Sequence, residues 1–297
     1  MLFVCLIALV IVSLSASAQN FGQNKVRYKK LKFQVYKTPH FEIYYYLKNE
    51  SMIKRFAQES ELWYTLHQQV FRDTFSKPNP IILYAHHPDF QQTTVIDGGI
   101  DVGTGGVTEG LKNRVVMPVM ENNQMTRHVI GHELVHAFQY HMLLGKGDDN
   151  PYENINNLPL WMIEGMAEYL SLGKKDAYTA MWIRDAYLNH DIPSIKDLTE
   201  SNKYFPYRYG QAFWSFIGST YGDTVIMPFF KNTARFGLQY GTRRTFGYDD
   251  KTLSSLWKNS IESTYKPYLK DTIQKPVGHL LINDKNSGKM NIAPAVS

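Results

Sequence analysis

The sequence contains almost no cysteine. Its single cysteine, Cys5, lies inside an apolar run near the amino terminus and has no lipobox around it, so lipidation is not expected. If that run is removed, no cysteine remains, which excludes disulfide bonds and thiolate ligands. Any metal ion would then have to be bound by histidine and carboxylate side chains.

Long apolar runs are also scarce. The stretch from Leu2 to Leu14 is too short to span a bilayer comfortably, and residues 16–18 after it fit an A-x-A cleavage signal. We therefore expect a signal peptide over residues 1–18 and a periplasmic or secreted protein with no membrane association after cleavage. No Lys or Arg precedes the run, which leaves an uncleaved anchor as the alternative.

Charge and signature motifs exclude further classes of protein. The 32 basic and 27 acidic residues give a net charge of only +5 without a Lys/Arg block, so nucleic acid is not an expected partner. The phosphate-binding pattern G-x-x-x-x-G-K-[ST], the G-x-S-x-G nucleophile pattern and internal repeats are all missing. The length and ordinary apolar content fit one large domain or two lobes around a shared cleft.

The most informative stretch that is present is an H-E-x-x-H pentapeptide running from His132 to His136. In a helix, residues i and i+4 share a face, so these two histidines can bind one ion, expected to be zinc. Glu133 beside them can take a proton from water at that site. Asparagine caps at 122–123, a stop at Gly145 and apolar periodicity between them predict a helix buried on one side. A chance pentapeptide on a surface helix is the alternative.

A second helical pattern, at 160–170, carries two glutamates. Pro159 suits its start and Gly173 its end. Glu164 and Glu168 are four residues apart and share one face of a segment that is otherwise mostly apolar. We predict that Glu164 is the third zinc ligand and that Glu168 accepts a hydrogen bond from the outer nitrogen of one histidine. An exposed acidic pair on a solvated face is the alternative.

The remaining patterns predict an α+β fold with a small mixed sheet, then the motif helix, then a mostly helical lobe. Strands are expected at 33–36, 41–46, 81–85 and 114–119, a long helix at 52–75, a glycine-rich loop or hairpin at 94–110, and helices at 176–189, 211–221, 224–236 and 253–268.

Together, the two motifs resemble those of the gluzincin metallopeptidases. The family pattern is H-E-x-x-H followed by W-x-x-E-G-x-A-E/T-Y, here at residues 161–169. The resemblance implies a thermolysin-like metallopeptidase domain that uses zinc. Residues 206–210 are similar to the P-Y-x-K-G stretch of gluzincin aminopeptidases, which implies that Tyr207 hydrogen-bonds the tetrahedral oxyanion. Tyr209 replaces the usual lysine there, and an ordinary aromatic residue is the alternative for Tyr207.

The sequence departs from the aminopeptidase pattern in two places. The gap between His136 and Glu164 is longer, and the extra length forms a polar loop at 145–151 that lacks the ligand spacing of a calcium loop. The G-x-M-E-N motif, which holds the amino end of a substrate, is missing. Residues 105–109 match it imperfectly, so Glu109 is a candidate substrate contact, but an exopeptidase is not favoured.

A wider resemblance covers nearly the whole chain. Residues 24–28, 38–45, 90–93 and 106–110 look like secreted bacterial proteins in which a gluzincin-like domain continues into a TolB-like β-propeller. The resemblance implies a peptidase domain over 19–275. It also implies a linker and the start of a missing propeller blade over 276–297, in a shortened family member or an incomplete reading frame.

The leading hypothesis is a secreted zinc metallopeptidase that hydrolyses a peptide or protein substrate through a zinc-activated water. Strand 114–119 would be the sheet edge that pairs with substrate backbone. One alternative is a catalytically silent zinc-fold binding module once coupled to a propeller, and another is a metal hydrolase for a non-peptide bond. The presence of Glu133 favours an enzyme, because a silent module would be free to lose it. The sequence does not specify an oligomeric state.

Overall fold

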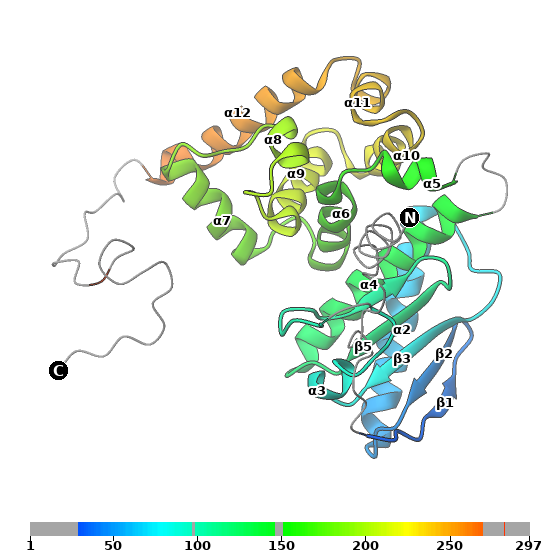
Figure 1. Ribbon diagram of the computed structural model, residues 1–297. Helices are drawn as coiled ribbons and strands as arrows, with labels where there is room; N and C mark the ends of the chain where they lie inside the picture. The colour runs from blue at the N-terminus through cyan, green and yellow to red at the C-terminus, as the bar shows by residue number, and fades with distance from the viewer. Residues whose placement is uncertain (1–28, 97–98, 146–150, 270–281, 283–297) are drawn as a thin grey trace, which may run out of the picture.

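The computed structural model describes residues 29–96, 99–145, 151–269 and 282 (Figure 1). The expected signal peptide, residues 146–150 of the polar loop, and the predicted linker and blade start at 276–297 apart from residue 282 lie outside the described residues. Within the described ranges, none of the helices has both the length and the apolar character needed to cross a membrane.

The described residues form a five-stranded mixed sheet. In spatial order its strands are β1 (Gln34–Lys37), β2 (Phe41–Tyr45), β3 (Asn79–Tyr84), β5 (Arg114–Pro118) and β4 (Val107–Glu109). Strands β2, β3 and β5 are parallel, whereas β1 and β4 pair antiparallel at the two edges. The strand predicted at 114–119 is therefore internal, and its prediction as an edge was wrong. The short strand β4 covers its outer side.

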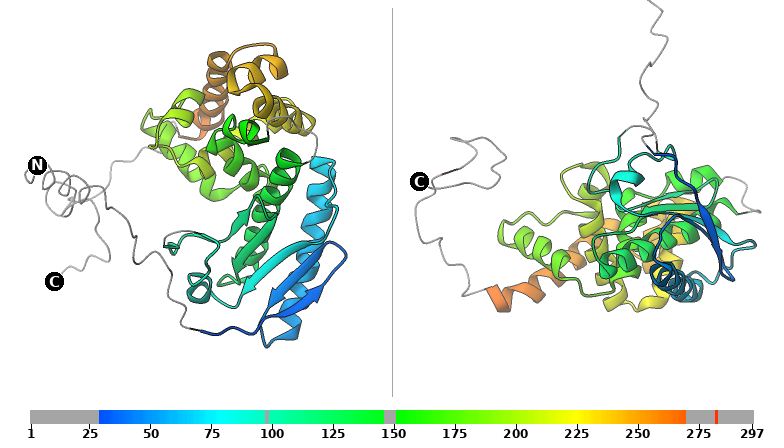
Figure 2. Two further views of the ribbon diagram at one scale, coloured as in Figure 1. Left: turned by 45° about the vertical axis from the view of Figure 1, so that its right-hand side comes forward. Right: turned by 90° about the horizontal axis from the view of Figure 1, so that it is seen from below.

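Two long helices, α2 (Glu50–Phe71) and α4 (Asn123–Leu144), pack on one face of this sheet, as Figure 2 shows. The short helix α3 (His87–Phe90) lies over the other face, where Phe90 packs near Val116. Helix α4 begins after Asn122, whose side chain accepts a hydrogen bond from the backbone N–H of Met125, as the sequence predicted. Helix α2 ends four residues earlier than predicted because Arg72 adopts a left-handed conformation with φ 53°.

The rest of the described chain is helical and forms the upper part of Figure 1. It contains α5 (Pro151–Asn156), α6 (Leu160–Leu172), α7 (Ala177–Leu188), α8 (Ile195–Glu200), α9 (Pro206–Thr220), η1 (Asp223–Val225), α10 (Ile226–Phe236), α11 (Leu238–Phe246) and α12 (Asp250–Leu269). The predicted α+β fold, with a small mixed sheet followed by helices, is confirmed. The short helices α3, α5, α8 and α11 were not predicted, and α9 begins five residues before its predicted start, at Pro206.

Helices α6 and α9 contact each other through their backbones. A Cβ atom added to Gly165 on α6 would lie 2.3 Å from the carbonyl carbon of Gly210 on α9, and one added to Gly210 would lie 2.2 Å from the carbonyl oxygen of Trp161. Only glycine permits this approach, because a Cβ needs more than 3 Å to a backbone atom. The contact lies directly beside Glu164 and one helical turn from Tyr207, so it sets how closely these two side chains approach.

Candidate metal centre

Three side chains from α4 and α6 bring one donor atom each to a common point. The Nε2 atoms of His132 and His136 are 3.1 Å apart, and Oε2 of Glu164 lies 3.3 Å from the first and 3.2 Å from the second. The two histidines are buried, and the Glu164 side chain is only 15% exposed. The helical spacing of four residues places both imidazoles on the α4 face that meets α6.

The outer nitrogens of both imidazoles are already bonded. His132 donates its Nδ1 proton to Oε1 of Glu168 over 2.9 Å, and His136 donates its Nδ1 proton to Oε1 of Gln139 over 2.8 Å. The orientation of the Gln139 amide is fixed because its nitrogen donates to the backbone oxygen of Ile163. Both Nε2 atoms of the neutral imidazoles therefore present lone pairs to each other and to a carboxylate.

This triangle of lone pairs fits a metal ion. Zinc bound at about 2.0–2.1 Å with tetrahedral angles holds its ligand atoms roughly 3.3 Å apart. The three edges of 3.1, 3.2 and 3.3 Å match that separation. Two imidazoles and one carboxylate are also a common ligand set for catalytic zinc. His132, His136 and Glu164 are therefore the residues that could hold the ion.

The electrostatics of the cluster favour a positive charge at its centre. Burial alone would lower the pKa of His132, but its hydrogen bonds to Glu164 and Glu168 outweigh burial and raise that pKa to about 10. Burial would raise the pKa of Glu164, but the adjacent His136 and His132 outweigh it and hold that pKa below its ordinary value. A divalent ion would supply the positive charge that these carboxylates favour, and its binding would displace the proton from His132.

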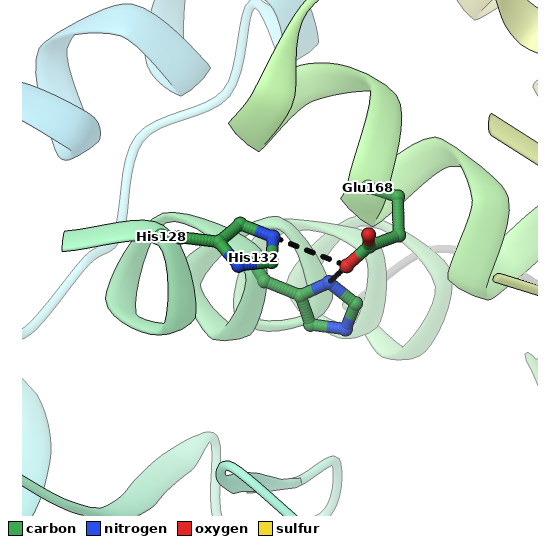
Figure 3. Close-up of side chains that lie close together, drawn as sticks. All are labelled: His128, His132 and Glu168. Atoms are coloured by element: carbon green, nitrogen blue, oxygen red, sulfur yellow. Dashed lines mark hydrogen bonds and ion pairs between the residues drawn. The ribbon is translucent and has the colours of Figure 1, made fainter. Parts of the chain in front are cut away.

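Glu168 holds His132 in place and is itself held by two further donors. It accepts hydrogen bonds from His128 Nε2 over 3.2 Å and from Arg208 Nη1 over 3.1 Å, in addition to the bond from His132. Figure 3 shows both imidazoles pointing at this carboxylate. Burial would raise the pKa of Glu168, but hydrogen bonds from His128 and His132 outweigh it and lower that pKa. Glu168 is thus a buried anion that fixes the orientation of an imidazole.

His128, His132 and Glu168 form a second group of potential metal-binding atoms, but it competes with the first (Figure 3). It would use Nδ1 of His132, whose proton Glu168 accepts, whereas the first group uses the free Nε2 lone pair. Both nitrogens of one neutral imidazole cannot be lone-pair donors together. The group with His136 and Glu164 keeps the hydrogen bonds of both Nδ1 atoms intact, so it is the better candidate.

Glu133 stands beside this group without belonging to it. Its side chain is buried, and its Oε2 accepts a hydrogen bond of 2.7 Å from the hydroxyl of Thr108 on β4. Gly106 also lies next to Glu133, because a Cβ added there would be 2.8 Å from Oε1 of Glu133. The carboxylate is therefore positioned from the sheet edge rather than by the histidines.

Tyr207, near the start of α9, also lies at the cluster. Its ring stacks on that of His132 with centroids 5.8 Å apart and an interplanar angle of 14°. Burial and the charge of Glu164 raise the pKa of its hydroxyl, which therefore stays protonated and able to donate. The structure thus brings together the sequence-predicted residues Glu133, Tyr207 and Glu168 and the predicted ligand set.

Glu109 is not brought to the cluster. It forms an ion pair with Arg114, the residue opposite it in β5, and a weaker one with Lys112. Because side chains alternate along a strand, Glu109 points to the opposite face from Thr108, which contacts Glu133. The candidate substrate contact at Glu109 thus gains no support from its position.

Sequence reasoning missed four residues that support the cluster. Two of them had a readable signal, since His128 lies four residues before His132 and Gln139 lies three residues after His136 on the same helix. The missed residues are Thr108, His128, Gln139 and Arg208.

The fold and the cluster define a metallohydrolase type of domain, in which two helices present two histidines and a glutamate beside an unligated carboxylate. The Peptidase MA superfamily matches residues 66–263, which include all residues of the cluster and its supports. The chain belongs to this superfamily, a group of metallopeptidases, which confirms the predicted family at that level. No curated protein matches the chain. The thermolysin-like subfamily and the propeller continuation stay predictions.

Proposed function

We propose that the chain is an exported zinc metallopeptidase that hydrolyses peptide bonds. The observation that carries this proposal is the triangle of His132, His136 and Glu164 donor atoms with Glu133 beside it. A structural zinc site has four protein ligands, whereas a catalytic site has three and leaves one position open. Export is proposed from the apolar run and cleavage signal within residues 1–18, which lie outside the described residues.

Each residue of the cluster has a distinct task in this proposal. Zinc held by His132, His136 and Glu164 would supply Lewis acidity, which makes water at the site more acidic. Glu133 accepts a proton from the attacking water and later gives it to the leaving amine. Tyr207 donates a hydrogen bond to the developing oxyanion, a role that its raised pKa supports. Glu168 keeps the His132 imidazole in one orientation and one tautomer.

The free edge of β4 is the proposed place for the substrate backbone. Among the described strands, β4 is the last on this side of the sheet, and its outer edge has backbone groups that an added strand can pair with. Thr108 on β4 contacts Glu133, so a peptide paired along β4 would pass close to the proposed base. This assignment replaces the internal strand β5 as the substrate-binding edge.

The test combines metal analysis with cleavage of a broad peptide library. The wild-type protein should bind about one zinc ion and cleave a subset of peptides. Glu133→Gln is nearly isosteric and should keep the zinc, yet lower kcat by at least about 10³-fold because it removes the proton acceptor. Glu121→Gln, at an exposed position before α4, is the matched control and should keep wild-type activity.

A second pair of variants tests the oxyanion contact. Tyr207→Phe should keep the zinc and lower kcat by roughly 10²–10³-fold. The control Tyr240→Phe removes a hydroxyl from an exposed residue of α11 and should change nothing. Wild-type turnover by Glu133→Gln would contradict the mechanism. If the zinc-loaded wild type cleaves no peptide, the catalytically silent binding module becomes the better explanation.

A further inference from the structure

The two oxygens of the Glu133 carboxylate lie in different surroundings. Oε2 accepts the hydrogen bond from the Thr108 hydroxyl at 2.7 Å. The same hydroxyl is 3.0 Å from the backbone oxygen of Glu133, but it has one proton, and the charged carboxylate at the shorter distance is the stronger acceptor. Among the residues that the structure describes, Thr108 supplies the one hydrogen bond to this carboxylate.

Oε1 of Glu133 faces the backbone of Gly106. A Cβ at position 106 would lie 2.8 Å from Oε1, 2.9 Å from Cγ and 3.0 Å from Cδ of Glu133. The φ angle of Gly106 is not in the left-handed region, so space rather than backbone conformation requires glycine here. Because Gly106 has no side chain, Oε1 stays uncovered, whereas Oε2 is bonded to Thr108.

Both contacts come from the same short segment at the sheet edge. Thr108 pairs with Val115 of β5, and this pairing fixes which face of the sheet the Thr108 side chain points to. Val115 is fully buried in the core beneath α4, so the hydroxyl of Thr108 points toward the same helix. The sheet thereby anchors a donor that a flexible loop could not hold as closely.

We propose that Thr108 is a positioning residue for Glu133, and that Gly106 supplies the space this position needs. Thr108 fixes Oε2, so that Oε1 is the oxygen presented to the reacting water. This inference rests on the proposed peptidase function. Its consequence is that the hydroxyl at position 108 acts on the rate of the reaction rather than on substrate or metal binding.

The test compares Thr108→Val with Thr108→Ser in zinc-loaded protein. Valine keeps the shape and strand preference of threonine but lacks the hydroxyl, whereas serine keeps the hydroxyl. Thr108→Val should lower kcat by about 10–100-fold, the usual effect of losing a hydrogen bond to a charged group, with little change in KM or zinc content. Thr108→Ser should remain within about 3-fold of wild type, because the donor that positions the base is kept.

A binding measurement without turnover separates this inference from the proposed function. Acetohydroxamic acid chelates zinc and gives a proton to a neighbouring base, so its affinity depends on how Glu133 is placed. Calorimetry should show about 10-fold weaker binding to Thr108→Val and near wild-type binding to Thr108→Ser. Unchanged kcat and hydroxamate affinity in Thr108→Val would overturn the inference, as would a serine variant as impaired as the valine variant.

The remaining outcomes are also decisive. If the wild type cleaves no peptide but binds hydroxamate, the proposed function fails, and the comparison of the two Thr108 variants still decides this inference. If the zinc-loaded wild type binds no hydroxamate, the proposed function and the inference on Thr108 both fail. Gly106→Ala should lower kcat because the added methyl group displaces Glu133, whereas Gly103→Ala, with no atom within 4 Å of the new Cβ, should not.

Discussion

Replacing Gly165 by alanine should both destabilise the protein and misplace the site. The new Cβ would lie 2.3 Å from the carbonyl carbon and 2.4 Å from Cα of Gly210, where ordinary contacts begin at 3.4 Å. These are backbone atoms of α9, so no side-chain rotation can relieve the overlap. The two helices must therefore separate by about 1 Å at this point.

This separation should lower both the stability of the fold and the rate of the reaction. Overpacking of a tightly packed interface costs about 1–3 kcal/mol, and the backbone contact places Gly165→Ala at the upper end of that range or beyond it. The same shift moves Tyr207 on α9 away from Glu164 on α6. A misplacement of about 1 Å in a catalytic arrangement can lower the rate by roughly 10²-fold.

Urea unfolding and peptide hydrolysis would be measured at equal zinc content. Gly165→Ala should unfold at a lower urea concentration with an unchanged m-value, and the fraction that remains folded should turn over slowly. Gly103→Ala is the matched control, because its new Cβ meets no atom within 4 Å. Wild-type stability together with wild-type kcat in Gly165→Ala would refute the backbone contact between α6 and α9.

Three further predictions concern metal binding and pH. Glu164→Ala should lose bound zinc in a chelator competition assay; retention of a full equivalent would contradict its assignment as a ligand. Glu168→Ala should weaken zinc binding by roughly 10–100-fold, and Arg208→Gln by less, because His128 still donates to Glu168. Equal zinc affinity in the wild type and both variants would contradict the role of Glu168 in holding His132. Burial lowers the pKa of His67 to about 4, so the folded state resists protonation and about 3 kcal/mol of stability should be lost as the pH falls from 6.5 to 4. His67→Gln can still donate to the backbone oxygen of Gly131 but has no group that titrates, so its free energy of unfolding should fall less over the same pH range.

The spacing of the predicted ligands within each helix could be derived from the sequence. His132 and His136 share a face because four residues make about one helical turn, and the same rule links Glu164 to Glu168. Helix caps at Asn122 and Pro159 further marked where these helices begin. Each of these inferences depends on local backbone geometry, which sequence spacing determines directly.

The parts that depend on contacts between elements could not be predicted. Whether Thr108 or Glu109 faces α4 depends on a strand register, and a shift of one residue reverses the answer. Strand β4 has only three residues, too few for an alternating pattern to reveal, so the sequence alone makes β5 look like the edge. Arg208 reaches Glu168 only because the glycines of α6 and α9 let these helices touch.

The ligand set also makes the proposed ion a cross-link within the chain. His136 on α4 and Glu164 on α6 are 28 residues apart, and the connection between them includes the polar loop that distinguishes this sequence from aminopeptidases. An ion held by both helices closes that connection into a ring, which lowers the entropy of the unfolded chain. Proteolytic cleavage between α4 and α6 should therefore report metal occupancy: the two fragments of a nicked protein, which share one hydrophobic core, should separate at a lower denaturant concentration once a chelator removes the ion.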